Sequence, residues 1–219
     1  MIRALALLWW LPGPLVAQEY IVTSGRLTDA DFYQLVACAA RPGEGCAAPL
    51  VRWAKPVVTV TFAPVPPAYP QEIAKEMNRA LDTSIHQING SAPGLSLRRV
   101  SKSEPADILL HLQPIRAGDA IRGTGYAALD GTPIGAAQVQ IFWNGRLELT
   151  EAAIVFAADI PMDQVGPIML EELTQSMGLM TDIRNAYYDT RSVFSEDSNS
   201  VRKLGEQDRA ALRFHYPAD

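Results

Sequence analysis

The stretch EELTQSMGL, from Glu171 to Leu179, has the pattern of a helix that ends at a glycine. Apolar residues recur every four positions through it and before it, at Val165, Met169, Leu173 and Met177. This spacing predicts a helix over residues 165–177 with one buried face. Glu171 and Gln175 lie almost opposite that face, one turn apart, and Glu172 lies to the side.

Segments on either side of this helix predict further strands and helices. Alternating or β-branched residues predict strands at 57–65, 95–100, 106–112 and 136–143. An apolar stripe predicts a long helix over residues 71–89, and GEQDRAALRFHY (205–216) predicts a closing helix. The period of LTEAAIVFAADI (149–160) does not separate helix from strand. The fold class that follows is α+β, with one domain over residues 55–219.

The helix and its neighbours resemble the zinc-peptidase domains of the metzincins, matrixins in particular. Their motif, H-E-x-x-H-x-x-G-x-x-H, puts its first and fifth positions on one ridge so that two imidazoles reach one zinc ion. In this sequence the histidine positions are filled by Glu171, Gln175 and Thr181. Glu172 stands at the general-base position and Gly178 at the glycine. The resemblance extends over the strands and long helix before this motif and over the closing helix.

This resemblance implies a metzincin-like (zincin) fold with a mixed, mostly antiparallel-edged sheet, a long first helix, a former active-site helix and a C-terminal helix. It does not imply zinc binding, because each histidine position holds another residue type. The remaining oxygen donors suit calcium, magnesium or manganese better than zinc. We therefore expect no cofactor. Glu172 is interpreted as a vestigial base, and the binding group comprises Glu171, Gln175, Thr181 and Asp182.

Three longer strings, EELTQSMGLMTD, SVFSED and LGEQDRAALRFHY, are also similar to a family of exported bacterial proteins of unknown function. In that family EELTQ stands where zinc peptidases keep histidines, which implies that Glu171 and Gln175 are a family pattern. Three interpretations of the carboxylates stay open. In the first, the carboxylates form a functional site. In the second, they lie on a solvent-exposed helix face, where such residues are common. In the third, Glu171 is a buried polar anchor that needs hydrogen-bond partners.

Other catalytic patterns are missing from the sequence. There is no G-x-S-x-G elbow, no C-x-x-C pair and no glycine loop of the kind that binds phosphates. The three histidines, His86, His111 and His215, have no partners at metal-ligand spacing. We interpret each of them as a surface histidine or as a core histidine whose hydrogen bonds are satisfied.

Residues 1–17 have the layout of a secretory signal peptide. Arg3 precedes an apolar run, a Pro-Gly-Pro break follows, and small residues end at Ala17. We predict cleavage near Ala17 and export to the periplasm or beyond, with an uncleaved anchor as the alternative. The apolar run is too short for a membrane span, and no later stretch is long enough.

The predicted export bears on the redox state of the two cysteines. In an oxidising compartment Cys38 and Cys46, which enclose a turn-rich loop, predict a structural disulfide. They belong to an N-terminal segment over residues 18–54. This segment also carries a predicted short helix, capped by Thr28 or Asp29.

Composition limits the classes of function. Hydrophobic residues make up 48% and charged residues 20% of the chain, which indicates a globular protein and not a disordered one. A net charge of −5 argues against a nucleic-acid partner. We expect an exported soluble protein that acts as a non-catalytic binding or structural module, with a protein or peptide partner that the sequence does not name. One alternative is a peptidase-like hydrolase with Glu172 as base and an unusual metal. Another is docking of a peptide on an exposed edge strand at 136–143.

Overall fold

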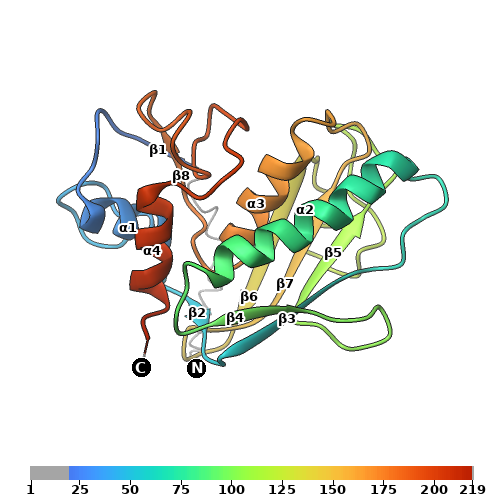
Figure 1. Ribbon diagram of the computed structural model, residues 1–219, viewed down its shortest axis with the longest axis horizontal. Coiled ribbons are helices and arrows are strands. Elements are labelled where there is room, and N and C mark those ends of the chain that lie inside the picture. Colours follow the sequence, from blue (N-terminus) through green and yellow to red (C-terminus); the bar gives the residue numbers. More distant parts are fainter. Residues whose placement is uncertain (1–19, 219) are drawn as a thin grey trace, which may run out of the picture.

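The structure, a computed structural model, describes residues 20–218. Two helices, α2 (Gln71–Asn89) and α3 (Val165–Gln175), lie side by side on one face of a six-stranded sheet (Figure 1). Beside them α1 (Asp29–Cys38) packs against α4 (Glu206–His215). The mixed class of helices and strands is as predicted, and no helix among the described residues is long and apolar enough to cross a membrane. The predicted signal peptide lies outside the described residues.

The six-stranded sheet is mostly parallel. Its strands are β2 (Arg52–Trp53), β3 (Val57–Phe62), β4 (Ser96–Arg99), β5 (Ile108–Leu112), β6 (Ala137–Trp143) and β7 (Glu148–Phe156). Parallel pairs run in the order β2-β7-β5-β3-β4, and β6 pairs antiparallel with β7. The prediction of a mostly antiparallel-edged sheet is therefore wrong. Helix α2 carries the chain back to the starting end of β3, so β4 runs parallel to β3, and residue alternation does not report strand direction.

Strand β7 explains why the segment at 149–160 had no clear period. Ala152 pairs with β5 on one side and with β6 on the other, so this part of β7 lies inside the sheet. Ile154 belongs to the main core under α2 and α3, whereas Val155 belongs to a smaller core on the opposite face. A strand buried on both faces has no polar side and appears in the sequence as a continuous apolar run.

Both long helices form where the sequence predicts them, but the surroundings of α3 differ from the prediction. Helix α3 begins at Val165, has Pro167 in its first turn and ends at Gln175, two residues early. It is not amphipathic, because only Gly166 and Glu171 keep partial exposure and its other residues are buried. The polar side of the helix therefore lies inside the molecule, and Glu172 and Gln175 are not surface residues.

The N-terminal segment forms the predicted short helix and disulfide. Thr28 caps α1, and its hydroxyl oxygen accepts a hydrogen bond from the backbone N–H of Asp31 at 3.1 Å. Cys38 and Cys46 are bonded, with 5.1 Å between their Cα atoms. A loop this short removes little chain entropy, so we expect the bond to contribute about 2–3 kcal/mol.

A second, two-stranded sheet joins the start of the described chain to the segment that follows α3. Strand β1 (Tyr20–Val22) pairs parallel with β8 (Asp182–Arg184), which directly follows the turn after α3. Phe32 of α1 is fully buried in the main core. The beginning of the described chain therefore lies next to the predicted site residue Asp182.

Candidate functional site

The turn after α3 brings predicted site residues together. The side-chain Nε2 of Gln175 donates a hydrogen bond to Oδ1 of Asp182 at 2.9 Å. Glu171 feels the negative charges of both Asp182 and Glu172, so these three carboxyl groups share one region. Thr181 is buried, and its backbone N–H donates to a carbonyl of α1 at 3.2 Å. Two of the former histidine positions, Gln175 and Thr181, are thus engaged in contacts within the chain.

The pKa of Glu171 lies well above its usual range. Burial is the largest cause, and the negative charges of Asp182, Glu172 and Glu196 raise this pKa further. Neither Glu171 nor Glu172 forms a salt bridge with any residue that the structure describes. A carboxyl group in a negative field without a cation favours its protonated form.

Glu172 is the most isolated acid of the group. Its side chain is buried, with 8% of the residue exposed, and burial raises the pKa of Glu172 to about 8. Within residues 20–218 its Oε2 atom has no hydrogen-bond partner. Because an ionised carboxylate without partners is costly to bury, this side chain carries a proton at neutral pH.

The residues around α3 do not fit a zinc ion. Zinc sites in proteins use mainly thiolate and imidazole donors, whereas the former histidine positions carry a carboxyl, an amide and a hydroxyl group. The amide of Gln175 is already bonded to Asp182. Among the described residues, no group of three or more His, Cys, Asp or Glu side chains is placed to hold a metal ion.

Gly178 allows a close approach between the end of α3 and the backbone of Val51, which directly precedes β2. Its φ is +97°, and a Cβ atom there would lie 2.2 Å from the carbonyl oxygen of Val51. The same carbonyl lies 3.0 Å from Nε2 of His215, whose Nδ1 is 3.2 Å from the hydroxyl of Tyr33. Burial lowers the pKa of His215 to about 4, so the ring is neutral. His215 is thus a core histidine with both nitrogens bonded.

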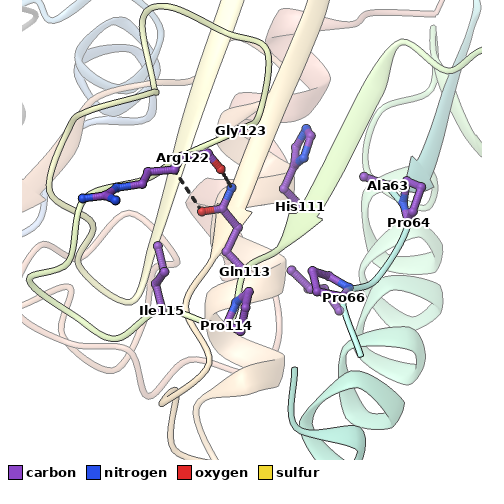
Figure 2. Close-up of a pocket in the computed structure, with 10 residues that line it drawn as sticks. Ala63, Pro64, Pro66, His111, Gln113, Pro114, Ile115, Arg122 and Gly123 are labelled. Carbon is purple, nitrogen blue, oxygen red and sulfur yellow. Dashed lines mark hydrogen bonds between the residues drawn. The ribbon is translucent and has the colours of Figure 1, made fainter. Parts of the chain in front are cut away.

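A pocket of about 320 Å³ lies at the carboxyl ends of the parallel strands β3 and β5 (Figure 2). Its walls are largely apolar and include Pro64, Pro66 and Pro114. Figure 2 shows the amide of Gln113 turned toward the backbone of Arg122, to which it donates at 2.8 Å and from which it accepts at 3.3 Å. Ligands of open parallel sheets commonly bind beyond the carboxyl ends of the strands, which makes this pocket a second candidate site.

His111 is the side chain of this pocket that has a buried polar atom without a partner. Its Nε2 atom is buried and has no hydrogen-bond partner among residues 20–218. Burial lowers the pKa of His111, although the charge of Asp130 acts in the opposite direction. The ring packs edge-on against Tyr126, and Tyr126 stacks on Phe142 of β6. His111 is thus neither a surface histidine nor a satisfied core histidine, in contrast to the sequence interpretation.

No motif in the sequence predicted this pocket. Its signal is a pair of proline-containing segments, APVPP and LQPI, that stand at the ends of two predicted strands. Neither segment carries a catalytic motif, and only the parallel pairing of β3 and β5 brings them together.

Comparison with known proteins places the chain in a family. The family model described as "Protein of unknown function (DUF2927)" matches residues 30–218. The chain belongs to this family. The match includes α3, the pocket and the closing helix α4, and it confirms the predicted membership of an uncharacterised family. That EELTQ is a pattern of this family stays a prediction, as does export. No curated protein matches the chain.

Proposed function

We propose that this member of the DUF2927 family is an exported binding module with a metzincin-like fold that does not hydrolyse peptides with zinc. The metzincin-like part of the proposal is supported by the order of the elements: a strand, the long helix α2, further strands, α3 and the closing helix α4. Gly178 adds support, because the glycine of the motif stands at a position of positive φ where a side chain would collide with the neighbouring backbone.

The hydrogen bond from Gln175 to Asp182 carries the non-catalytic part of the proposal. An amide that is committed to a carboxyl group on the next strand is a structural contact and not a free metal ligand. The raised pKa values of Glu171 and Glu172 agree with this role, because protonated acids bind cations poorly. The group around α3 therefore holds the turn after the helix in place.

Binding of a partner peptide is supported on the face that joins the pocket to β6. His111 lines the pocket, and Tyr126 connects it to Phe142 on β6 through ring contacts. On the edge opposite β7, β6 pairs with no strand in the described part of the chain. Trp143, at the end of β6, is 46% exposed. An extended peptide could add to this edge and place a side chain in the pocket.

Elemental analysis of the mature protein, purified without chelators, tests the absence of zinc chemistry. We expect less than about 0.1 zinc per chain, because strong structural or catalytic zinc sites are occupied stoichiometrically. One zinc per chain that is lost in Gln175→Ala would overturn the proposal.

Selection of a random peptide library tests the binding face: enriched peptides should bind the wild type and not Phe142→Asp. Equal binding to both would place the peptide elsewhere.

A hydrolase that uses Glu172 is the second candidate function. It is favoured by one observation, the raised pKa of a buried acid without a partner, which is a common property of acid–base catalysts. Peptidase activity of the wild type that Glu172→Gln abolishes, while folding is unchanged, would establish this candidate. Equal background activity of both proteins would exclude it.

A further inference from the structure

Strand β6 is an open edge of the six-stranded sheet, and its residues carry no charge. On the side away from β7 it pairs with no strand in the described part of the chain. Its sequence, AQVQIFW, contains no Asp, Glu, Lys, Arg or Pro. Proteins usually protect an exposed edge against pairing with another chain by charged residues, by proline or by making the strand short. Strand β6 has none of these three protections.

The opposite edge of the sheet has the protection that β6 lacks. Among the described strands β4 pairs with β3 alone, and it is only four residues long. Two of those residues are Arg98, which is exposed, and Arg99. The charge and the short length oppose the addition of a further strand at β4. The two edges therefore differ, and β6 is the edge at which another strand can add.

The backbone groups of β6 point alternately toward β7 and toward the open side. In an antiparallel pair, residues that exchange hydrogen bonds with the partner strand alternate with residues that do not. Just before β6, the carbonyl oxygen of Ala136 accepts from the N–H of Ala157 at 2.9 Å, so the even-numbered residues of β6 face β7. The backbone groups of Val139 and Ile141 therefore point to the open side. The side-chain amide of Gln140 donates to the carbonyl oxygen of Ile141 at 2.9 Å, which agrees with this direction.

The side chains of β6 match those of a second, antiparallel β6. With a two-fold axis at Gln140, Val139 lies opposite Ile141 of the second copy, and Ala137 lies opposite Trp143 of the second copy. The first pair joins two β-branched residues, which pack well across strands. The second pair joins the smallest side chain of the strand to the largest. Trp143, which is 46% exposed, would be covered by the small residues at the beginning of the other strand.

The same register also uses the open backbone groups. Val139 and Ile141 both direct their N–H and C=O groups outward, so this pair forms two hydrogen bonds, and the two-fold axis repeats it. The two copies of Gln140 meet at a position without backbone hydrogen bonds, where side chains lie closest. There each amide can leave the carbonyl of Ile141 and bond to the other amide.

We propose that two copies of this chain pair through their β6 strands, antiparallel about a two-fold axis at Gln140, and form one continuous sheet across a closed dimer. The charged β4 strands then lie at the two outer edges and prevent further addition. This inference rests on the proposed function, because it names a second copy of the chain as the partner at the β6 edge. Two paired strands bury less surface than a permanent dimer does, so we expect a Kd of about 10–100 µM.

Sedimentation equilibrium of the mature protein, over about 5–500 µM, tests the dimer. We expect a reversible equilibrium between monomer and dimer. Trp143→Glu should weaken it at least about tenfold, because an aromatic contact is lost and a charge enters the edge. Leu147→Glu is the matched control, since Leu147 is 43% exposed but lies in the turn between β6 and β7, and it should change the Kd by less than about twofold. Thermal unfolding of each variant shows whether the fold is intact.

Cysteine cross-linking tests the register. The two native cysteines are bonded to each other, so one introduced cysteine is the single free thiol. Gln140→Cys should form a disulfide between two copies under mild oxidation, because directly opposed Cα atoms at such a position lie about 4.5 Å apart. Trp143→Glu, added to this variant, should slow the reaction. Leu147→Cys lies outside the paired strands and should cross-link much more slowly than Gln140→Cys.

Three results would overturn the proposal. The first is a monomer at about 500 µM, well above the expected Kd. The second is equal weakening by Trp143→Glu and Leu147→Glu, and the third is cross-linking of Gln140→Cys no faster than that of Leu147→Cys. Peptide selection separates this inference from the proposed function. If the chain is monomeric while selected peptides bind the wild type and not Phe142→Asp, only the second copy is excluded as the partner. If neither peptides nor a second copy bind at β6, both proposals fail.

Discussion

Two buried acids of this protein, Asp208 in α4 and Glu172 in α3, differ in how their oxygens are bonded. Asp208 is fully buried and accepts three hydrogen bonds, from the hydroxyl of Ser192 at 2.6 Å and from the backbone N–H groups of Val193 and Gly205 at 3.1 and 2.7 Å. Glu172 is almost as buried, yet its Oε2 has no partner in the described chain. Burial alone does not decide the role of an acid.

The partners decide what each acid does. Burial raises the pKa of both, but at Asp208 the three donors act against burial, whereas at Glu172 no donor does. Asp208 therefore joins the loop before α4 to the first turn of that helix through directed bonds. Glu172 is instead protonated in the core. The first arrangement stabilises the fold, and the second leaves a group that responds to pH.

Removal of Asp208 is expected to have the largest effect. Asp208→Ala should lower the free energy of unfolding by about 3–5 kcal/mol, because three donors lose their acceptor inside the protein. Urea unfolding measures this change. Glu206→Ala, an exposed acid in the same helical turn, is the matched control and should change stability by less than about 1 kcal/mol. A loss below about 1 kcal/mol for Asp208→Ala would show that the hydrogen bonds of Asp208 do not stabilise the fold more than the exposed Glu206 does.

Gly178, just after the helix that carries Glu172, tests how closely the end of α3 lies against Val51 and His215. Gly178→Ala should cost about 2–4 kcal/mol, because φ is +97° and the new Cβ would lie 2.2 Å from the carbonyl oxygen of Val51. Thermal or urea unfolding measures the effect. Gly135→Ala is the control, since a Cβ there meets no atom within 4 Å and the residue has no positive φ. Equal stability of the two variants would mean that the end of α3 does not lie against the backbone of Val51.

The pH dependence of stability separates Glu172 from His215. Glu172 binds its proton more tightly in the folded chain, so its stabilising effect is present below pH 4.5 and is lost as pH rises to about 8. His215 binds its proton less tightly when folded, so its contribution is lost as pH falls from 6.5 to about 4. The free energy of unfolding, measured by urea unfolding at each pH, should be highest between pH 4.5 and 6.5 and should drop by about 1–2 kcal/mol by pH 8. A rise in stability from pH 6.5 to 8 would contradict this account.

Glu172→Gln should have the smallest effect and should flatten the alkaline side of that profile. The amide keeps the shape of the side chain but cannot ionise, so the variant should exceed the wild type by about 1 kcal/mol at pH 8 and match it near pH 5. Glu44→Gln, at an exposed position, should leave the profile unchanged. If Glu172→Gln follows the wild-type profile, another acid is responsible for the alkaline loss.

The candidate site illustrates what an amphipathic pattern leaves undecided. The sequence places Glu171 and Gln175 on one line of α3, and the structure keeps this relation while it buries Gln175 and leaves Glu171 partly exposed. Helical spacing predicts which side chains share a face of the helix. It does not predict which other part of the chain packs against that face. The bond between Gln175 and Asp182 depends on the turn after the helix, and no local pattern predicts its geometry.

The sequence by itself determined the elements that depend on neighbours in the chain. The long helix α2, the closing helix α4 and the Cys38–Cys46 disulfide follow from periodicity, helix-end signals and short loop closure. The tertiary structure alone decided the parallel direction of the sheet, the burial of α3 and the pocket that contains His111. These features arise from contacts between residues far apart in the chain. The energies of such contacts depend on how separate elements pack against one another. The local order of residue types does not encode that packing.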